Sequence, residues 1–512
     1  MLANATFLRS INEKLKKLAS DGETSFLSGA QWRVLKAIEQ VAKNNPGLKI
    51  NQELVDQIVF PSKMTEVRFT VDFKGKKYLC VGIRAWFDNG KLHEKGQIVK
   101  GGIRFLAVDP TELDGIVKIS DIQKARELAL DDVMALGLEM LAKNSGTNFS
   151  INVLRDCGLA RKNSKLKTLD VVGGAKGVIL APRSLHLPDH NEFVRKALEA
   201  FGYKLGLASM VGWDRDVPAG DIGTTGLVKG TSVLDGFVDG YERALKDLQV
   251  QMPNNLMVAV ATGKTANAKY LGNSDRGIAT GFGTVEALKS WSESKKKDLK
   301  DLTVVFDGAG NAALPAAKIL VENGLRVVGM TDSRSAIFVK DGLTVKDIEG
   351  IGLIKAKRGS LVDWVKSSKT GQVVKSKLAL WKKSDMNVLF ISSDAMIINK
   401  TNVKNLPEGI LIIDGANGPV TPLAEKELAK LKIEHLTGSF ANSGGVIGSL
   451  IEWAANIADI ELEKGEALDY ISYSIRSNLK TMRRLVDQKK VGSLAEAFYY
   501  MALEQFIKLW LK

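Results

Sequence analysis

Cysteine and histidine are scarce in this chain of 512 residues, which contains two cysteines and four histidines. Neither Cys80 nor Cys157 lies in a CxxC pair, and the histidines form no ligand pattern. Disulfide frameworks and zinc sites need these residues in pairs or clusters, so the sequence argues against both and predicts no metal site. The small number of cysteines also favours a reducing, cytoplasmic location. The four histidines are His93, His186, His190 and His435.

Long apolar runs are also missing, so the sequence predicts no membrane-spanning helix. The first residues contain neither an apolar core nor a cleavage site of the kind a signal peptide needs, and they predict an amphipathic helix. Hydrophobic residues at 45% and charged residues at 25% are ordinary for a globular protein. A chain of this length exceeds one core, which predicts two to four domains.

Acidic residues are outnumbered, and the net charge is +14. A basic protein can bind nucleic acid, but the lysines are spread out, with only short clusters at 295–297 and 355–358. No basic motif carrying aromatic residues is present. We therefore favour a basic surface that attracts anionic metabolites and treat nucleic acid as the weaker alternative.

Glycine is abundant around one lysine. In the stretch 171–179, three glycines surround Lys176 between two apolar runs. Glycine lets the backbone approach a ligand closely, and a lysine in a dry pocket loses affinity for its proton, which suits carbonyl and imine chemistry. A solvated lysine in a glycine-rich turn is the alternative interpretation.

The first half of the chain shows clear periodicities. Residues 1–60 predict helices, including 31–44 and 51–60, and alternation over 65–73 and 77–87 predicts an antiparallel pair of strands. Residues 121–143 predict a helix whose apolar face ends in Lys143. This lysine is a snorkelling side chain, a charge at the helix C-terminus or an inward-facing ligand for a carboxylate. The weakly patterned residues 145–169 predict an insertion.

Two further segments complete this half. Residues 191–208 predict a helix, which leads to a turn rich in proline and glycine that contains Asp221. A rigid turn would fix that carboxylate as catalysis requires. Capping a helix N-terminus is the common alternative role for an aspartate.

The second half contains a dinucleotide-binding pattern. An apolar strand at 302–307 leads into Gly308-Ala-Gly310-Asn-Ala-Ala313, a helix to Asn323, and a strand 325–331 that ends at Asp332. The glycines permit a tight turn against a pyrophosphate, and the following helix N-terminus attracts it. Asp332 would bind a ribose hydroxyl of NAD, whereas Arg334 could serve the 2′-phosphate of NADP, so both cofactors stay open.

These patterns predict an α/β protein with two domains, one of them a doubly wound Rossmann-type sheet extended by strands 388–391 and 410–413. We expect a substrate-binding and oligomerisation domain over 1–226 and a dinucleotide-binding domain over 227–438. The C-terminal helices, 439–512, should return to the first domain.

Eight motifs in order resemble the glutamate/leucine/phenylalanine/valine dehydrogenase family, and within it the branch that acts on glutamate. The motifs are Lys100-Gly-Gly-Ile-Arg104, Met140-Leu-Ala-Lys143-Asn144, Gly173-Gly-Ala-Lys176-Gly177, Val217-Pro-Ala-Gly-Asp221, Arg276-Gly-Ile-Ala-Thr280-Gly281, Gly308-Ala-Gly-Asn311, Gly415-Ala-Asn417-Gly-Pro419 and Asn442-Ser-Gly-Gly-Val-Ile-Gly-Ser449.

The resemblance implies a role for each matching residue. Lys176 is similar to the catalytic lysine, Asp221 to the catalytic acid and base, and Lys143 to the lysine that holds the α-carboxylate. Lys100 and Ser449 resemble the pair that binds the side-chain carboxylate. The other substrate residues implied are Gly101, Gly102, Ala219, Asn442 and Val446; the cofactor residues implied are Arg276, Thr280, Gly308, Gly310, Asn311, Ala312, Asp332, Ser333 and Asn417.

The implied reaction is oxidative deamination of L-glutamate to 2-oxoglutarate and ammonium, and its reverse, with NAD or NADP. Relatives are often hexamers, which implies a homo-oligomer. A dehydrogenase for another amino acid, or a catalytically silent paralogue that senses nucleotides, are the alternatives.

Four departures from the family pattern stand beside the match. The gap of 33 residues between Lys143 and Lys176 contains the insertion, Val178 replaces a glycine, Asp307 precedes the phosphate loop, and Ser392–Asp394 interrupt a usual Pro-Ala-Ala segment.

Overall fold

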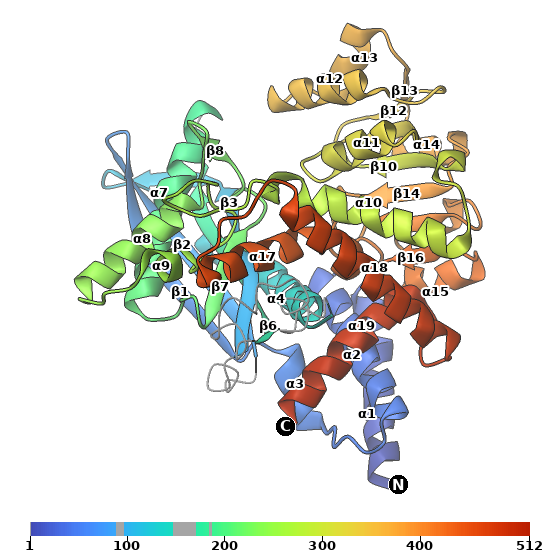
Figure 1. Cartoon of the computed structure of the whole chain (residues 1–512), viewed down its shortest axis with the longest axis horizontal. Helices are drawn as coiled ribbons and strands as arrows, with labels where there is room; N and C mark the ends of the chain where they lie inside the picture. Colours follow the sequence, from blue (N-terminus) through green and yellow to red (C-terminus); the bar gives the residue numbers. More distant parts are fainter. Residues whose placement is uncertain (1, 89–96, 147–169, 184–186, 512) are drawn as a thin grey trace. The chain divides into compact units, whose positions relative to one another are not determined.

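The computed structural model describes residues 2–88, 97–146, 170–183 and 187–511. The chain forms two compact units, each assembled from separate stretches (Figure 1). The parallel-sheet unit comprises Met1–Pro46, Ile278–Gly445 and Ile471–Met501. The mixed-sheet unit comprises Gly47–Gly277, Val446–Tyr470 and Ala502–Lys512.

The mixed-sheet unit is built on a seven-stranded sheet in the order β4-β5-β2-β6-β3-β7, with β1 paired to β2. β1 and β2 form the predicted antiparallel pair, and Phe69, Val71 and Phe73 point into the core while the residues between them are exposed. β6 runs antiparallel to β2 and parallel to β3, which is parallel to β7. The strands are β1 (Lys63–Phe73), β2 (Lys76–Phe87), β3 (Gln97–Val108), β4 (Pro110–Leu113), β5 (Ile116–Ile119), β6 (Asp170–Pro182) and β7 (Asp216–Gly220).

Helices cover both faces of this sheet. On one face, Phe193 and Phe201 of α7 (Leu187–Leu207) join the core, and Gly82 of β2 leaves room for the Phe201 ring. On the other face, α4 (Ile122–Gly146) lies so close that a Cβ on Gly174 would be 2.3 Å from the Leu141 nitrogen. Since side chains alternate along a strand, Lys176 points to the α4 face.

Shorter elements complete the mixed-sheet unit. The predicted helices at 121–143 and 191–208 are confirmed as α4 and α7. The predicted insertion, 145–169, lies outside the described residues except for Ser145 and Gly146, which end α4. The remaining elements are α3 (Gln52–Val59), β8 (Leu227–Val228), β9 (Thr231–Ser232), α8 (Asp235–Asp247), α9 (Asn254–Val258) and most of α17 (Gly444–Ala458).

The parallel-sheet unit contains a doubly wound sheet in the order β13-β12-β11-β10-β14-β15-β16. Five neighbouring strands are parallel, namely β11, β10, β14, β15 and β16. At the β11 edge, β12 and β13 extend the sheet with antiparallel strands. The chain leaves β10 for β11 on one side and later continues to β14 on the other, so the two adjacent strand ends form a topological switch point. The strands are β10 (Thr303–Asp307), β11 (Arg326–Thr331), β12 (Ala336–Phe338), β13 (Gln372–Val374), β14 (Val388–Ile391), β15 (Leu411–Asp414) and β16 (Glu434–Leu436).

Helices also flank this second sheet (Figure 1). The predicted strand 302–307, the helix after the glycine loop and the strand 325–331 are confirmed as β10, α11 and β11. The predicted strands 388–391 and 410–413 are confirmed as β14 and β15. The helices are α1 (Leu2–Asp21), α2 (Phe26–Asn44), α10 (Arg276–Lys295), η3 (Leu299–Asp301), α11 (Ala313–Glu322), α12 (Val345–Ala356), α13 (Leu361–Ser368), α14 (Lys377–Lys383), η4 (Val403–Asn405), α15 (Pro422–Lys430), α16 (Gly438–Ala441), α18 (Glu466–Asp487) and part of α19 (Leu494–Trp510).

The compact units divide the chain differently from the predicted boundaries. Residues 1–46, expected in the first domain, belong to the parallel-sheet unit, where α1 and α2 pack against α15. Residues 227–277 belong to the mixed-sheet unit because α8 packs along α7. The C-terminal segment 439–512, expected to return to the first domain, is shared between both units.

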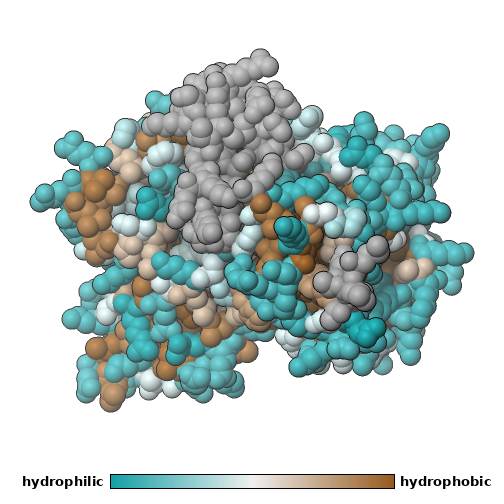
Figure 2. All heavy atoms as spheres, turned by 90° about the horizontal axis from the view of Figure 1, so that it is seen from below, coloured by the Kyte–Doolittle hydropathy of each residue, from teal (hydrophilic) through white to brown (hydrophobic). Residues whose placement is uncertain are grey.

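The surface is largely hydrophilic on the face shown in Figure 2, with smaller hydrophobic areas. Exposed apolar side chains of the mixed-sheet unit include Phe60, Met64 and Leu128. Within the described ranges, no helix combines the length and the apolar character needed to cross a membrane.

Candidate active site

Lys176 and Asp221 form an ion pair in the mixed-sheet unit. Lys176 lies in β6 and is almost wholly buried, whereas the Asp221 side chain, in the turn after β7, is 22% exposed. The backbone N–H of Asp221 donates to the Thr224 hydroxyl at 2.9 Å, which fixes the turn. No helix begins directly after Asp221, so this residue does not cap one, and its carboxylate contacts the lysine instead.

A second cation also holds this carboxylate. Arg104 donates from Nε to Asp221 Oδ2 at 2.9 Å and from Nη1 to both oxygens of Asp132 on α4, each at 2.9 Å. Sequence reasoning assigned neither Arg104 nor Asp132 a role. Two features of the sequence could have indicated them. Arg104 is the last residue of the motif that begins at Lys100, and Asp132 lies three residues after Ala129 of the apolar stripe.

The pKa values of both members of the pair are lowered, for different reasons. Burial lowers the pKa of Lys176, and the nearby Asp221 only partly offsets this effect. Burial alone would raise the pKa of Asp221, but Lys176 and Arg104 outweigh it and hold that pKa well below its usual range. The carboxylate is therefore ionised, and the lysine releases its proton more readily than an exposed one.

Lys143 belongs to the same cluster. It is buried near the end of α4, and burial lowers its pKa to about 8, with Glu139 raising it and Lys176 lowering it. The snorkelling interpretation is therefore wrong. A Cβ on Gly102 would lie 2.8 Å from the Asp221 Cβ and 3.1 Å from Lys176 Nζ, so this glycine keeps the space beside the pair open.

A second group of cations surrounds the side chain of Lys100. Lys100 is 1% exposed, and its Nζ donates to the Thr262 hydroxyl at 3.0 Å. Burial lowers its pKa to about 7, with Glu452 raising it and Lys264 and Arg276 lowering it. Thr262 was missed in the sequence; its backbone pairs with β7, where its N–H donates to Pro218 O at 2.9 Å.

Arg276 and Ser449 are also joined. Arg276 donates from Nε to the Ser449 hydroxyl at 3.1 Å and from Nη2 to Gly220 O at 3.3 Å. Arg276, expected among the cofactor residues, thus contacts the expected substrate residue Ser449 and the residue after Ala219. Ala219 is buried in β7 beside Gly102, and Val446 is half-buried one turn before Ser449 on α17. Gly101 is required because a Cβ there would overlap the Ala175 oxygen.

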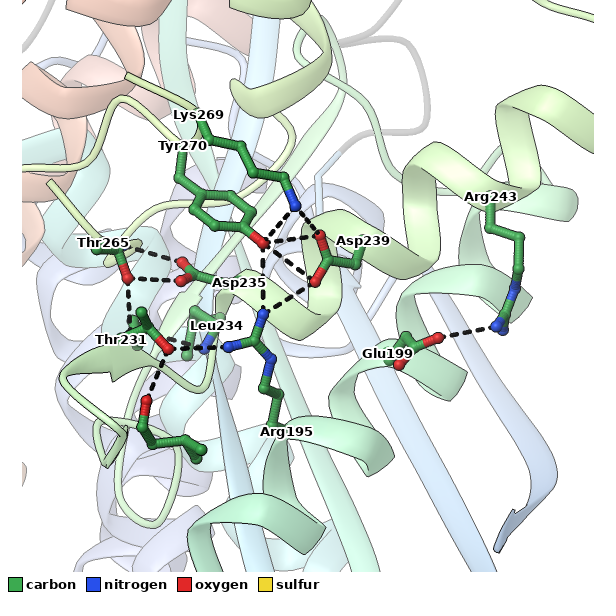
Figure 3. A network of polar contacts seen from close by, with 12 residues as sticks. Arg195, Glu199, Thr231, Leu234, Asp235, Asp239, Arg243, Thr265, Lys269 and Tyr270 are labelled. Atoms are coloured by element: carbon green, nitrogen blue, oxygen red, sulfur yellow. Dashed lines mark hydrogen bonds and ion pairs between the residues drawn. The ribbon is translucent and has the colours of Figure 1, made fainter. Parts of the chain in front are cut away.

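The loop that carries Thr262 is held from two sides. Lys264 Nζ donates to Glu452 Oε1 of α17 at 2.5 Å, and both side chains are fully buried. Thr265 donates from its backbone to Asp235 of α8 at 2.9 Å, and Tyr270 reaches Asp239 of the same helix, as Figure 3 shows. These contacts fix the position from which Thr262 meets Lys100.

The parallel-sheet unit contains the predicted phosphate loop at the switch point. Gly308 has φ +118°, and a Cβ there would lie 2.8 Å from the Ser392 carbonyl carbon, so only glycine fits. Gly310 and Asn311 are exposed, and Ala312 directly precedes α11. Exposed backbone at a helix N-terminus is what a pyrophosphate needs, so the loop fits a dinucleotide.

Two neighbouring side chains contact the buried carboxylate of Asp307. Ser393 donates to its Oδ1 at 2.5 Å, and Lys377 Nζ lies 3.4 Å from its Oδ2. The departures at Asp307 and Ser392–Asp394 are therefore linked, since a buried carboxylate and a hydroxyl that binds it occur together.

The carboxylate of Asp332 accepts hydrogen bonds from groups of its own chain. Its Oδ1 accepts the N–H groups of Arg334 and Ser335, and its Oδ2 accepts the Leu361 N–H at 2.9 Å and Lys355 Nζ at 3.1 Å. These donors lower its pKa to about 2 although burial alone would raise it. The side chain is only 2% exposed, whereas Ser333 and Arg334 beside it are exposed, and the expected bond of Asp332 to a ribose hydroxyl stays a prediction.

The other expected cofactor residues lie at the same edge of this sheet. Asn442 donates from Nδ2 to Asn417 Oδ1 at 3.1 Å, so these two predicted site residues are brought together. Thr280 lies in the first turns of α10, next to Gly281, where a Cβ would be 2.9 Å from the Ala312 oxygen. Asn417 and Thr280 thus border the loop edge formed by the ends of β10 and β15.

Comparison with known proteins agrees with this geometry. A family model described as Glutamate/Leucine/Phenylalanine/Valine dehydrogenase matches residues 272–510. The glutamate dehydrogenase of Aeropyrum pernix is 30% identical over 355 residues, which cover 68% of this chain and 76% of that protein. The chain belongs to this dehydrogenase family. It is therefore an amino-acid dehydrogenase.

Other family members agree in sequence and in fold. The NADP(+)-dependent glutamate dehydrogenase of Pyrobaculum calidifontis is 27% identical over 65% of this chain and 73% of its own length. Plasmodium falciparum glutamate dehydrogenase has a TM-score of 0.74 at 20% identity, covering 99% of this chain and 94% of that one. The hetero-hexameric glutamate dehydrogenase of Thermus thermophilus has a TM-score of 0.68 at 16% identity, covering 92% and 94%.

Proposed function

We propose that the chain is a glutamate dehydrogenase that interconverts L-glutamate with 2-oxoglutarate and ammonium and prefers NADP to NAD. The observation that carries the proposal is the pair of cation groups in one unit. One group surrounds Lys176 and Asp221, and the other consists of Lys100, Arg276 and two hydroxyls. A dicarboxylate with a reacting carbon between its two charges matches this arrangement.

Each carboxylate of glutamate would meet its own lysine. Lys143 would hold the α-carboxylate beside the reacting carbon, and Lys100 with Ser449 would hold the side-chain carboxylate. Arg276 would add positive charge to the second group through the Ser449 hydroxyl. Ionic hydrogen bonds in a dry pocket are stronger than neutral ones, so substrates lacking the distal charge would bind poorly.

The chemical steps follow from the pKa shifts of the pair. NADP, when bound, accepts the hydride that leaves Cα of the amino acid. Lys176 would activate a water molecule for attack on the imine carbon, because burial lowers its pKa and lets it release a proton more readily than an exposed lysine. Asp221, ionised at the start, would carry protons between the substrate nitrogen and oxygen, and Arg104 would hold it in line.

The preference for NADP rests on Asp332. Its oxygens already accept hydrogen bonds from donors of its own chain, which makes it a weaker partner for the ribose hydroxyls of NAD. Arg334 and Lys355 stand beside it and suit a 2′-phosphate. The NADP-dependent relative from Pyrobaculum calidifontis supports the same choice.

We further propose a homo-oligomer, with a hexamer as the specific form, in the cytoplasm. The exposed apolar side chains of the mixed-sheet unit would lie in contacts between copies. The hetero-hexameric glutamate dehydrogenase of Thermus thermophilus supports an assembly of six subunits, though not their identity.

The test is absorbance at 340 nm with 2-oxoglutarate, ammonium and either NADPH or NADH. We expect rapid oxidation of NADPH, slower oxidation of NADH, and no turnover by Lys176→Ala. Turnover of other 2-oxo acids alone would disprove the substrate, and silence with every 2-oxo acid would disprove the function.

A further inference from the structure

A buried histidine lies between two carboxylates in the parallel-sheet unit. His435 of β16 is 5% exposed. Its Nε2 is 2.8 Å from Asp414 Oδ2, and its Nδ1 is 2.7 Å from Glu425 Oε1. Since each ring nitrogen faces a carboxylate, only the imidazolium can donate to both. Burial opposes its charge, but Asp414 and Glu425 raise its pKa to about 10, so it is protonated at neutral pH.

This cluster lies directly below the loop that carries Asn417. Asp414 is the last residue of β15, and the same Oδ2 that binds His435 also accepts the N–H of Gly438 at 3.1 Å. Gly438 begins α16, and Asn442 follows that helix. Asn442 donates from Nδ2 to Gly415 O at 3.2 Å and to Ala416 O at 3.0 Å. One carboxylate oxygen therefore connects the end of β15 to the start of α16.

The packing in this region leaves little freedom. A Cβ on Gly438 would lie 2.2 Å from the Ala416 oxygen, so the start of α16 touches the loop directly. Any movement of Asp414 would displace Gly438, and through it Ala416 and Asn442. Close-packed interiors transmit such displacements because they contain no spare volume.

From this geometry we infer that His435 is a positioning residue: its contact with Asp414 sets the loop Gly415–Asn417 and the position of Asn442. The inference rests on the proposed function, for which Asn417 is an expected cofactor residue and Asn442 an expected substrate residue. None of the eight motifs contains His435, so this role is additional to them.

Other charged groups packed against the cluster hold its far end. Arg33 and Lys36 of α2 lower the pKa of Glu425, although burial raises it and His435 has the larger lowering effect. Arg33 also donates from Nη2 to Val420 O at 2.9 Å, just beyond the loop. The positive charges of α2 thus favour the ionised form of Glu425, which faces Nδ1 of His435 while Asp414 faces Nε2.

The test compares three variants of the full chain with the wild type. Kd for NADPH is measured by fluorescence titration at a temperature where circular dichroism shows each variant folded. We expect His435→Gln and Asp414→Asn each to raise Kd about tenfold, since each loses an ionic hydrogen bond. Glu425→Gln, which leaves the His435–Asp414 contact in place, should raise it less. His190→Gln, in the other unit, is the matched control and should leave Kd unchanged.

Two measurements distinguish a positioning role of His435 from a purely structural one. The double variant His435→Gln/Asp414→Asn should raise Kd no more than either single variant, because both remove the same contact. A lowered Tm with Kd unchanged in both single variants would overturn the inference. If His435→Gln does not fold, Asp414→Asn gives the same comparison. A wild type that binds no NADPH would overturn this inference and the proposed function together, whereas binding that His435→Gln leaves unchanged would overturn only the former.

Discussion

The two units treat positive charge in opposite ways. In the mixed-sheet unit, Lys100 and Lys143 are buried with their pKa values lowered to about 7 and about 8. In the parallel-sheet unit, the buried His435 has its pKa raised to about 10 by two carboxylates. Binding of an anion would therefore favour the charged forms of Lys100 and Lys143, whereas His435 is held as a cation by carboxylates of its own chain.

This difference explains what each region can recognise. A buried lysine with a lowered pKa gains its proton when a carboxylate binds, so substrate binding and protonation are coupled. His435, whose two ring nitrogens both face carboxylates of its own chain, acts on structure instead. The four predictions below test this contrast, beginning with the largest expected effect.

Removing the central lysine should have the largest effect. We expect Lys176→Ala to lower kcat by about 10³- to 10⁴-fold, because the activated water and its proton path are lost. Stopped-flow or steady-state absorbance at 340 nm measures this. Lys204→Ala, an exposed lysine on α7, is the control and should keep full activity. A loss below tenfold in Lys176→Ala would remove this residue from the chemical step.

Replacing Lys100 should change the substrate rather than the rate of the chemical step. We expect Lys100→Leu to lower kcat/KM for glutamate by roughly 10²- to 10³-fold, since the side-chain carboxylate loses a buried ionic partner. The value for leucine should rise or stay unchanged. Assays with both amino acids and one cofactor measure the ratio, and an unchanged preference for glutamate would contradict the assignment of this pocket.

Cofactor choice should respond to a smaller change in the other unit. We expect Arg334→Ala to reduce the ratio of kcat/KM for NADPH to that for NADH by roughly 10- to 100-fold, since one charge-assisted hydrogen bond is lost. Arg326→Ala, on the neighbouring strand and also exposed, is the control. Equal ratios in the two variants would mean that the 2′-phosphate is bound elsewhere.

The pH dependence of glutamate binding should show the smallest effect. Burial places the pKa of Lys100 at about 7, so its protonated fraction falls as pH rises through that value. If only the protonated form holds the side-chain carboxylate, KM for glutamate should rise roughly fivefold between pH 7 and pH 8. Steady-state kinetics over that range measure it. Lys100→Leu should lose this dependence, and a KM that stays level in the wild type would place the pKa of Lys100 higher.

The sequence alone determined the elements and their chemistry. The alternation of residues 65–73, the apolar stripe of 121–143 and the glycine loop after 302–307 predict β1, α4 and the start of α11, because each depends on neighbours along the chain. The motifs also placed Lys176, Asp221, Lys100 and Lys143 in one family pattern. Such local signals do not depend on how distant segments meet.

Only the tertiary structure decided how these residues interact. Thr262 beside Lys100, Arg104 between Asp221 and Asp132, and the full use of Asp332 by its own chain all join segments that are far apart in sequence. The predicted boundaries at 226 and 438 also differ from the compact units, since helices such as α2 and α8 pack by long-range contacts. Burial and pairing set the charge of each site residue, and both arise only when the chain folds.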